Sequence, residues 1–259
     1  VSGSAPACEP PPLLVINEVD ADQPSTDTGE FIEIANTGGS SADLNGLRLV
    51  LYNGATDLVY STTVLANVML AAGDYYVVCY GPNASAYCDQ TGVGGSIQNG
   101  NPDGIRLTSA DGSVIIDQMS YGGLPMITTE GSSAPVDPGT AGLGVARVPD
   151  GSDTDDNSVD FIVNCITPGA SNIAADSDND GTADCLDVCP GGPEPGTPCE
   201  DNNANTGNDV IQANCLCEGV PIDCEGTPGG AELPGTDCDD LDPNTADDVW
   251  GMDCVCAGV

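Results

Sequence analysis

The first two thirds of the chain, from residue 13 to about residue 173, consist of short apolar runs separated by turn residues. The runs are rich in Val, Ile, Leu and Tyr, and clusters of Gly, Asn, Asp and Ser lie between them. Strands are predicted at Leu13–Val19, Phe31–Ile34, Leu47–Tyr52, Asp57–Leu65, Tyr75–Tyr80, Ile105–Thr108 and Ser113–Tyr121. Seven or more short strands in a segment of this length predict an all-β sandwich.

Two short patterns refine this prediction. Asp111-Gly112 lies between two of the apolar runs and predicts a hairpin turn. Phe31–Ile34 alternates apolar and polar positions, which predicts a strand buried on one face only. Helical periodicity is weak throughout, so the predicted fold class is all-β.

After Thr167-Pro168-Gly169 the apolar runs disappear, and Cys, Asp, Asn, Gly and Pro dominate. Such a segment cannot bury an ordinary core, so we expect disulfides and metal to stabilise a helix-poor tail. The predicted organisation is a Pro-rich arm at 1–12, a β-sandwich at 13–173, a calcium loop at 174–190, and Cys-rich repeats at 191–220 and 221–259.

The two Cys-rich repeats are copies of one unit. Residues 199–220 align without a gap to residues 238–259, and the alignment pairs three cysteines in each copy. Asn205-Thr206 matches Asn244-Thr245, and Asp209-Val210 matches Asp248-Val249. Repeated supersecondary units of this kind usually stack on one another.

The most specific chemical motif begins at residue 176. Acidic residues and one carbonyl fall at offsets typical of a calcium loop, and Gly181 stands at its sharp turn. Five closely spaced carboxylates repel one another unless a cation lies among them, and Ca²⁺ prefers such oxygen ligands. The predicted ligands are Asp176, Asp178, Asp180, Thr182 (through its carbonyl), Asp184 and Asp187.

Each Cys-rich repeat carries a weaker form of the same pattern. Neither copy has an acid at the last loop position or Gly at the turn position, so side-chain turns remain an alternative. The predicted ligands are Asp201, Asn203, Asn205, Gly207 (carbonyl) and Asp209 in the first copy, and Asp240, Asp242, Asn244, Ala246 (carbonyl) and Asp248 in the second. The cofactor prediction is therefore Ca²⁺, with one strong site and two more in the repeats.

Two acidic groups within the sandwich are further candidates for cation binding. One lies early and one late, but turn chemistry is the preferred explanation for both. Their members are Asp20, Asp22, Asp27 and Glu30, and Asp153, Asp155, Asn157 and Asp160.

The charge balance excludes one class of partner and favours another. The chain has 41 acidic residues, three arginines, no lysine and no histidine, which gives a formal charge of -38. Nucleic acid is excluded because no basic surface exists to meet phosphates. Self-repulsion at this charge destabilises a compact state unless salt or bound cations offset it. A halophilic surface without a specific metal is the alternative interpretation.

Thirteen cysteines without histidine argue against zinc and for disulfides in an oxidising, extracellular setting. We expect a Cys79–Cys88 bond across a short turn, a Cys8–Cys165 bond, and pairing mostly within each repeat. The odd count leaves at least one cysteine free or bonded to another chain. The cysteines and the calcium loop therefore predict a secreted protein whose signal peptide has been removed. No apolar run has the length of a membrane span, so no anchoring in a bilayer is expected.

Residues 176–190, which end in Asp187-Val188-Cys189-Pro190, resemble a thrombospondin type 3 repeat. An EF-hand would need flanking helices, and the Pro and Gly residues on both sides of the loop oppose them. The resemblance implies calcium held by Asp side chains in a wire-like arrangement, with a neighbouring disulfide through Cys189. Cys185, directly after Asp184, departs from the usual pattern.

Most of residues 13–173 resemble a bacterial lamin-tail domain. The resemblance rests on motifs spread over the segment, and it implies an immunoglobulin-like sandwich that serves as an extracellular binding or structural module. The repeats are similar to Cys- and Asn-rich modules of large secreted Bacteroidetes proteins. The motifs are Ile16-Asn17-Glu18-Val19, Glu30–Ile34, Asn36, Gly38, Asp43-Leu44, Gly46, Arg147–Asp150, Asp160-Phe161 and Thr167–Gly169.

Catalysis is not expected. The absence of histidine and lysine removes the commonest general base and the amine nucleophile. A carboxylate pair for glycoside cleavage would need an aromatic cleft, and the chain has one Trp and two Phe.

The leading hypothesis is an extracellular, calcium-binding structural or adhesive protein, plausibly the self-assembling subunit of a bacterial surface fibre. Its partner would then be a second copy of itself. The alternative is a non-catalytic accessory region of a larger secreted enzyme or adhesin that binds carbohydrate or the cell surface. Neither hypothesis involves nucleic acid or membrane insertion.

Overall fold

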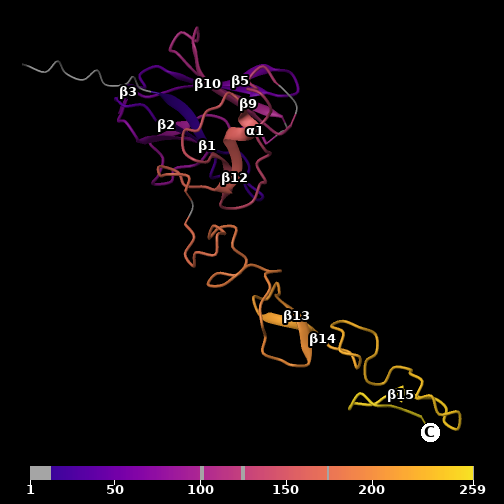
Figure 1. Cartoon of the computed structure of the whole chain (residues 1–259). Helices are drawn as coiled ribbons and strands as arrows, with labels where there is room; N and C mark the ends of the chain where they lie inside the picture. Colours follow the sequence, from indigo (N-terminus) through magenta and orange to yellow (C-terminus); the bar gives the residue numbers. More distant parts are fainter. Residues whose placement is uncertain (1–12, 100–101, 124–125, 174, 259) are drawn as a thin grey trace, which may run out of the picture. The chain divides into compact units, whose positions relative to one another are not determined.

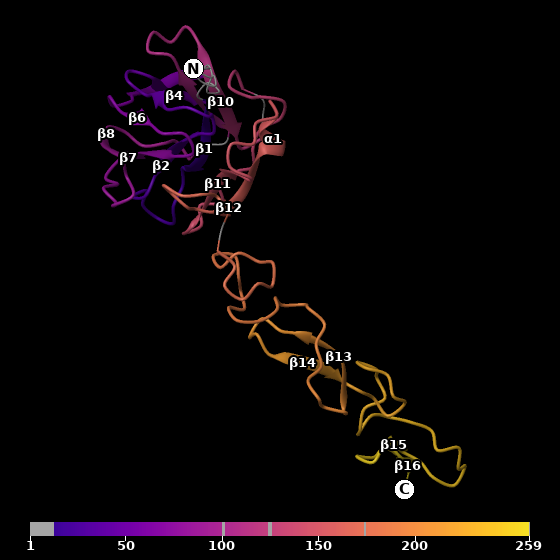
Figure 2. The ribbon, with the colours of Figure 1, turned by 60° about the vertical axis from the view of Figure 1, so that its left-hand side comes forward.

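The computed structural model describes residues 13–99, 102–123, 126–173 and 175–258. The chain divides into two compact units, Val1–Ala175 and Asp176–Val259. Figure 1 and Figure 2 show the strands of the first unit in indigo to salmon and those of the second in orange to yellow. The boundary lies two residues beyond the predicted end of the sandwich.

The first unit contains two main β-sheets. The six-stranded sheet has the order β12 (Phe161–Cys165), β11 (Leu143–Arg147), β1 (Leu14–Asp20), β2 (Phe31–Asn36), β7 (Tyr75–Tyr80), β8 (Gln90–Val93). The four-stranded sheet has the order β10 (Ile115–Tyr121), β9 (Asp103–Thr108), β4 (Arg48–Asn53), β5 (Leu58–Val64). The short strands β3 (Ala42–Asp43) and β6 (Met69–Leu70) pair with each other, and the helix α1 spans Asn157–Asp160.

The two sheets enclose one hydrophobic core, as in a sandwich. Ile16 and Ile34 of the larger sheet are fully buried in the same cluster as Leu49, Leu51 and Leu107 of the smaller one. All seven predicted strands are present, each within two residues of its expected ends. The predicted hairpin is confirmed as well, because β9 and β10 pair antiparallel on either side of the turn.

The prediction that Phe31–Ile34 is buried on one face only is wrong. Every residue of β2 is buried, including Glu33. The reason is that β2 lies between β1 and β7 near the middle of the larger sheet, and both faces of that sheet are covered. Glu33 tolerates burial because its carboxylate accepts hydrogen bonds from the Asn17 side chain at 3.0 Å and from the Gly169 amide at 2.7 Å.

The outer face of the larger sheet is partly covered by a disulfide-closed loop. The Cys79–Cys88 disulfide, which was predicted from spacing, holds residues 80–88 against the sheet. Phe31, Val77 and Cys79 form a second buried cluster there, with the Tyr87 ring edge-on to Phe31 at 5.8 Å. This cover explains why Phe31, Val77 and Cys79 are buried on the outer face of the sheet.

The second unit consists of two related hairpins. In the first repeat β13 (Thr206–Ile211) pairs with β14 (Cys217–Pro221), and in the second β15 (Val249–Trp250) pairs with β16 (Cys256–Ala257). Cys189 is the one apolar residue of the described range 176–258 that is buried. Disulfides therefore replace a hydrophobic core in this unit, as its composition predicts.

All twelve cysteines within the described residues are disulfide-bonded. Three disulfides lie within the predicted repeat boundaries, namely Cys199–Cys217, Cys224–Cys254 and Cys238–Cys256. Cys189–Cys215 links the acidic loop to the first repeat, which agrees with a disulfide through Cys189. The expected Cys8–Cys165 bond lies outside the described residues on the Cys8 side, and Cys165 is disulfide-bonded.

Over the described part of the chain, no helix has the length and apolar character needed to cross a bilayer.

Candidate metal centre

The loop that begins at residue 176 brings three predicted ligands together. Asp176, Asp178 and Asp180 each offer a carboxylate oxygen, and these oxygens lie within 4.8 Å of one another. The backbone holds this shape through short-range hydrogen bonds, in which the Gly181 amide donates to Asp176 at 3.0 Å and the Thr182 amide donates to Asp180 at 2.8 Å. Gly181 has a φ of +98°, a conformation that favours glycine at the predicted sharp turn.

Asp184 and Asp187, the other two predicted carboxylates of this loop, do not belong to that group of three. Asp184 accepts hydrogen bonds from the amide and hydroxyl of Ser177, both at 2.7 Å, and these bonds lower its pKa. Asp187 accepts a hydrogen bond from the Cys189 amide at 2.6 Å. The pKa of Asp187 is raised, first by burial, and Glu194 lies beside it.

The two Cys-rich repeats build the same arrangement twice. In the first, the Asp201 amide donates to Asp209 at 3.1 Å and the Gly219 amide donates to Asp201 at 3.3 Å. In the second, the Asp240 amide donates to Asp248 at 3.2 Å and the Gly258 amide donates to Asp240 at 3.4 Å. The hydroxyls of Thr206 and Thr245 donate to the same leading aspartates. Backbone donors lower the pKa of Asp201 and Asp240, so both remain ionised.

Each repeat also contributes an acid that the sequence prediction missed. Glu200 joins Asp201 and Asp209 in a group whose oxygens lie within 4.8 Å, and Asp239 joins Asp240 and Asp248 in the same way. The repeat alignment already contained this signal, because it places an acid directly before the leading Asp in both copies. The predicted side-chain ligands Asn203, Asn205, Asp242 and Asn244 line the same turns, where Asn203 and Asp242 accept hydrogen bonds from the amides of Asn205 and Asn244.

Each of the three acidic loops contains one carboxylate oxygen that is buried and accepts no hydrogen bond. These atoms are Asp176 Oδ1, Asp209 Oδ1 and Asp248 Oδ1. A buried carboxylate oxygen without a donor is costly, and a bound cation is one of the few ways to satisfy it. Asp209 and Asp248 occupy equivalent positions of the two repeats, so the buried oxygen without a hydrogen bond is a feature that both repeats share.

Glycine keeps space open beside two of these oxygens. A Cβ atom at Gly219 would lie 1.9 Å from Asp209 Oδ1 and 3.0 Å from the Gly207 carbonyl oxygen. A Cβ atom at Gly258 would lie 1.8 Å from Asp248 Oδ1 and 2.8 Å from the Ala246 carbonyl oxygen. The predicted carbonyl ligands Gly207 and Ala246 therefore lie on the same side of the loop as the orphaned oxygens. This oxygen-only donor set fits a hard divalent cation such as Ca²⁺.

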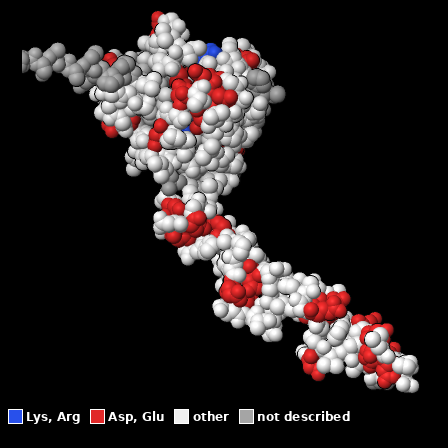
Figure 3. Space-filling view, viewed as in Figure 1, with Lys and Arg blue, Asp and Glu red and all other residues white. Residues whose placement is uncertain are grey.

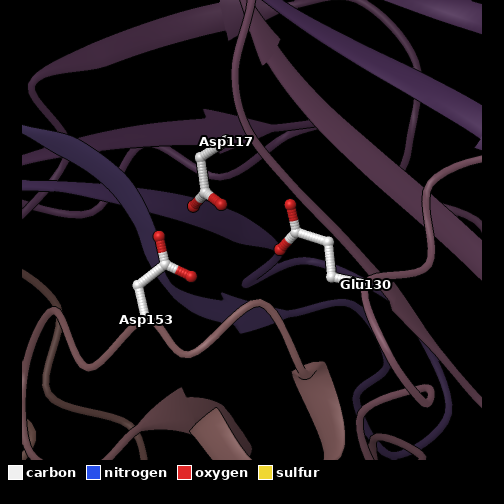
Figure 4. Close-up of side chains that lie close together, drawn as sticks. All are labelled: Asp117, Glu130 and Asp153. Carbon is white, nitrogen blue, oxygen red and sulfur yellow. The ribbon is translucent and has the colours of Figure 1, made fainter.

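A fourth acidic group lies inside the sandwich and was not predicted as a unit. Figure 4 shows the carboxylates of Asp117, Glu130 and Asp153 pointing toward one another, and their oxygens lie within 4.8 Å. Asp117 comes from β10, while Glu130 and Asp153 come from loops. Burial raises the pKa of Asp117 to about 6 and that of Glu130 to about 7.

This fourth group already has a cation. The fully buried guanidinium of Arg147 lies 3.3 Å from Asp117, 3.6 Å from Asp153 and 3.1 Å from Asp160. It also donates to the Ile16 carbonyl at 2.9 Å and stacks over the Phe161 ring at 4.4 Å. We therefore assign Asp117, Glu130 and Asp153 a structural role in the sandwich and no role in metal binding.

Hydrogen bonds hold both acidic groups that the sequence placed within the sandwich, but only some of these bonds belong to local turns, and Glu30 Oε1 is buried without a donor. The Gln23 side chain donates to Asp20 at 2.7 Å, and the Asn99 side chain donates to Asp22 and Asp27 at 2.8 and 3.0 Å. In the later group, Asp160 accepts hydrogen bonds from the Thr154 amide, and the Asp155 amide donates to Asp153. Asn157 bridges Ser120 and Glu130 from the start of α1.

A scan against protein-family models finds the Lamin Tail Domain over residues 9–123. The sandwich contains an immunoglobulin-like lamin tail domain. The family match ends at residue 123, directly after β10, whereas the sequence motifs that suggested the family extend over most of residues 13–173. A search of the curated proteins finds no match. The thrombospondin-like and Cys-rich resemblances of the tail remain predictions.

The motifs that suggested the lamin tail domain meet in one buried polar network. The Glu18 carboxylate accepts hydrogen bonds from the Thr167 amide at 2.9 and 3.1 Å. Asn17 donates to both Glu33 and Asp150 at 3.0 Å, and the Gly169 amide donates to Glu33. The conformation of the closing Thr167–Gly169 segment is thus fixed by acids on β1 and β2. None of these carboxylates faces a basic side chain among the described residues.

This network makes the stability of the lamin tail domain depend on pH. Burial raises the pKa of Glu18 to about 8 and that of Glu33 to about 7. The folded state therefore retains protons that the unfolded chain releases above pH 4.5, and the free energy of unfolding should fall between about pH 4.5 and pH 8. Each group contributes a slope of at most about 1.4 kcal/mol per pH unit.

Urea unfolding followed by near-ultraviolet dichroism measures this dependence, because all seven tyrosines lie in the first unit. The substitution Glu18→Gln should flatten the pH profile, while Asp74→Asn, at an exposed position, should leave it unchanged. A profile that rises over this range, or one that Glu18→Gln does not alter, would contradict the assignment.

Proposed function

We propose that this protein is an extracellular, calcium-binding structural or adhesive protein that assembles with itself into a surface fibre. The observation that carries the proposal is the buried, hydrogen-bond-free carboxylate oxygen that recurs in all three acidic loops of the second unit. Calcium at these loops would neutralise part of the formal charge of -38 and stiffen a unit that lacks an ordinary core.

The surface and the cysteine chemistry support an extracellular setting. An immunoglobulin-like domain and multiple disulfides are typical of extracellular proteins. Figure 3 shows acidic side chains gathered in patches on both units, with very few basic ones. A surface of this kind interacts favourably with divalent cations and unfavourably with nucleic acid, so calcium is the partner that the electrostatics favour.

The proposal includes no catalytic role. The acidic groups of the second unit are tied into backbone turns rather than aligned around a cleft, and Asp117, Asp153 and Asp160 of the sandwich surround a buried arginine. The first arrangement is suited to binding a cation, and the second stabilises the sandwich through ion pairs.

Electron microscopy of purified protein, with millimolar calcium and with a chelator, tests the assembly. We expect fibres in calcium that dissociate or lose their regular form when the ion is removed. Particles that remain single in calcium would contradict the fibre, and bound calcium on such particles would favour the alternative of a binding module within a larger secreted protein.

A further inference from the structure

The outer face of the four-stranded sheet carries a basic hollow in an otherwise acidic protein. Arg48 and Arg106 line it, and their backbones lie close together because Arg106 pairs with Val50, two residues along β4 from Arg48. The hollow has a volume of about 370 Å³, and its walls include Val50, Val59 and Ile115. It therefore combines two positive charges with apolar side chains and with the hydroxyl-bearing Thr62, Thr108 and Ser113.

The charge of these two arginines is not neutralised within the described residues. No carboxylate in this part of the chain lies within 4.0 Å of either, and the ion pairs found there all belong to the buried Arg147. Arg106 is held by neutral groups, since it donates to Gln118 at 2.8 Å and to the Tyr52 hydroxyl at 3.3 Å and stacks over the Tyr52 ring at 5.1 Å. The chain has 41 acidic residues, yet none among those described pairs with Arg48 or Arg106. The two arginines are therefore suited to bind an acidic group of another molecule.

A loop of the second repeat has the complementary chemistry. Leu241 is 85% exposed, with Asp239 and Asp240 before it and Asp242 after it. If one calcium ion binds this loop, its four carboxylates, with Asp248 included, still keep two net negative charges. The loop thus presents an apolar tip within an acidic rim.

Leu241 is also held in a conformation that does not suit leucine. Its φ is +62°, in the left-handed region, and the equivalent residue of the first repeat, Asn202, has a φ of +58°. Asparagine tolerates this region, whereas a bulky side chain there is strained by roughly 1 kcal/mol or more. The leucine therefore contributes neither burial nor a favourable backbone conformation to the folding of its own repeat, which points to a contact with another molecule.

We propose that the loop Asp239–Asp242 of one copy docks into the Arg48–Arg106 hollow of a second copy. The Leu241 side chain would contact Val50, Val59 and Ile115 in the hollow. The flanking carboxylates would pair with the guanidinium groups of Arg48 and Arg106. Because the two surfaces differ, the contact is head-to-tail and can repeat from copy to copy. This inference rests on the proposed function, in which calcium orders the loop and the protein assembles.

Three variants of the full chain, compared with wild type, test the docking in millimolar calcium by sedimentation velocity. The hollow variant is Arg48→Gln with Arg106→Gln. The loop variant is Leu241→Asn, which restores the residue of the first repeat and removes the strain. The control variant is Met252→Asn, which replaces another highly exposed apolar residue of the same repeat. We expect wild type and the control to assemble, and the hollow and loop variants each to associate at least tenfold more weakly.

Mixing the hollow variant with the loop variant gives the decisive result. Each supplies the surface that the other lacks, so the mixture should form one-to-one pairs that do not grow. A mixture that stays monomeric, or a hollow or loop variant that assembles like wild type, would overturn the docking while leaving the fibre intact. Wild type that never assembles would overturn both the fibre and the docking. Native mass spectrometry of the same samples would measure the number of bound calcium ions independently of assembly.

Discussion

Chelation of calcium is expected to unfold the second unit while the lamin tail domain stays folded. At free calcium a hundredfold above the dissociation constant, each occupied site adds about 2.7 kcal/mol to stability. The acidic loops and the disulfides are the main stabilising features of this unit, because Cys189 is the one buried apolar residue among its described residues. Trp250, the single tryptophan, reports on the second unit, and limited proteolysis provides a second measurement.

A matched pair of glycine substitutions controls this experiment. Gly219→Ala should weaken calcium binding in the first repeat, because the added Cβ would lie 1.9 Å from Asp209 Oδ1. Gly192→Ala places its Cβ in open space and should change nothing. Sodium chloride at equal ionic strength should stabilise less than calcium. A chelated second unit that remains ordered and protease-resistant at low ionic strength would contradict the prediction.

Replacement of Arg147 by methionine is expected to lower the free energy of unfolding of the sandwich by about 3 to 5 kcal/mol, the usual cost of breaking a buried ion pair from one side. The guanidinium is fully buried and interacts with Asp117, Asp153 and Asp160, so its removal leaves several acids without a counter-charge. Denaturant unfolding followed by tyrosine dichroism measures the loss.

Arg48→Gln is the matched control for this substitution. Arg48 is half-buried and has no ion pair among the described residues, so its replacement should change the free energy of unfolding by less than about 0.5 kcal/mol. Equal effects of Arg147→Met and Arg48→Gln would show that the buried cluster is not a stabilising centre.

The strands of the sandwich could be predicted from sequence because their apolar runs are bounded by turn residues. Tyr75–Tyr80 matches β7 at both ends, and Asp111-Gly112 correctly marks the hairpin between β9 and β10. The strands β3, β6 and β8, each of two to four residues, were not among the predicted strands, and neither were the longer β11 and β12. Their pairing depends on neighbours that are distant in sequence.

The acidic loops were only partly predictable. Spacing located Asp176, Asp178 and Asp180, because a loop of this kind positions its ligands through local backbone turns. Asp184 and Asp187 satisfied the same spacing, but the backbone directs them to Ser177 and Cys189 instead. Glu200 and Asp239 lie outside the spacing and join the group because the disulfide-closed hairpin folds back on itself.

The sequence alone determined the all-β class, the repeat, the disulfide-dependent tail and the acidic loops, since each depends on composition or on residues close together in the chain. Only the tertiary structure decided which acids are buried, where Arg147 lies and which arginines share a hollow. These features join residues as far apart as Asp117 and Arg147 or Arg48 and Arg106. Long-range pairing of strands brings such residues together, and local sequence patterns carry no information about it.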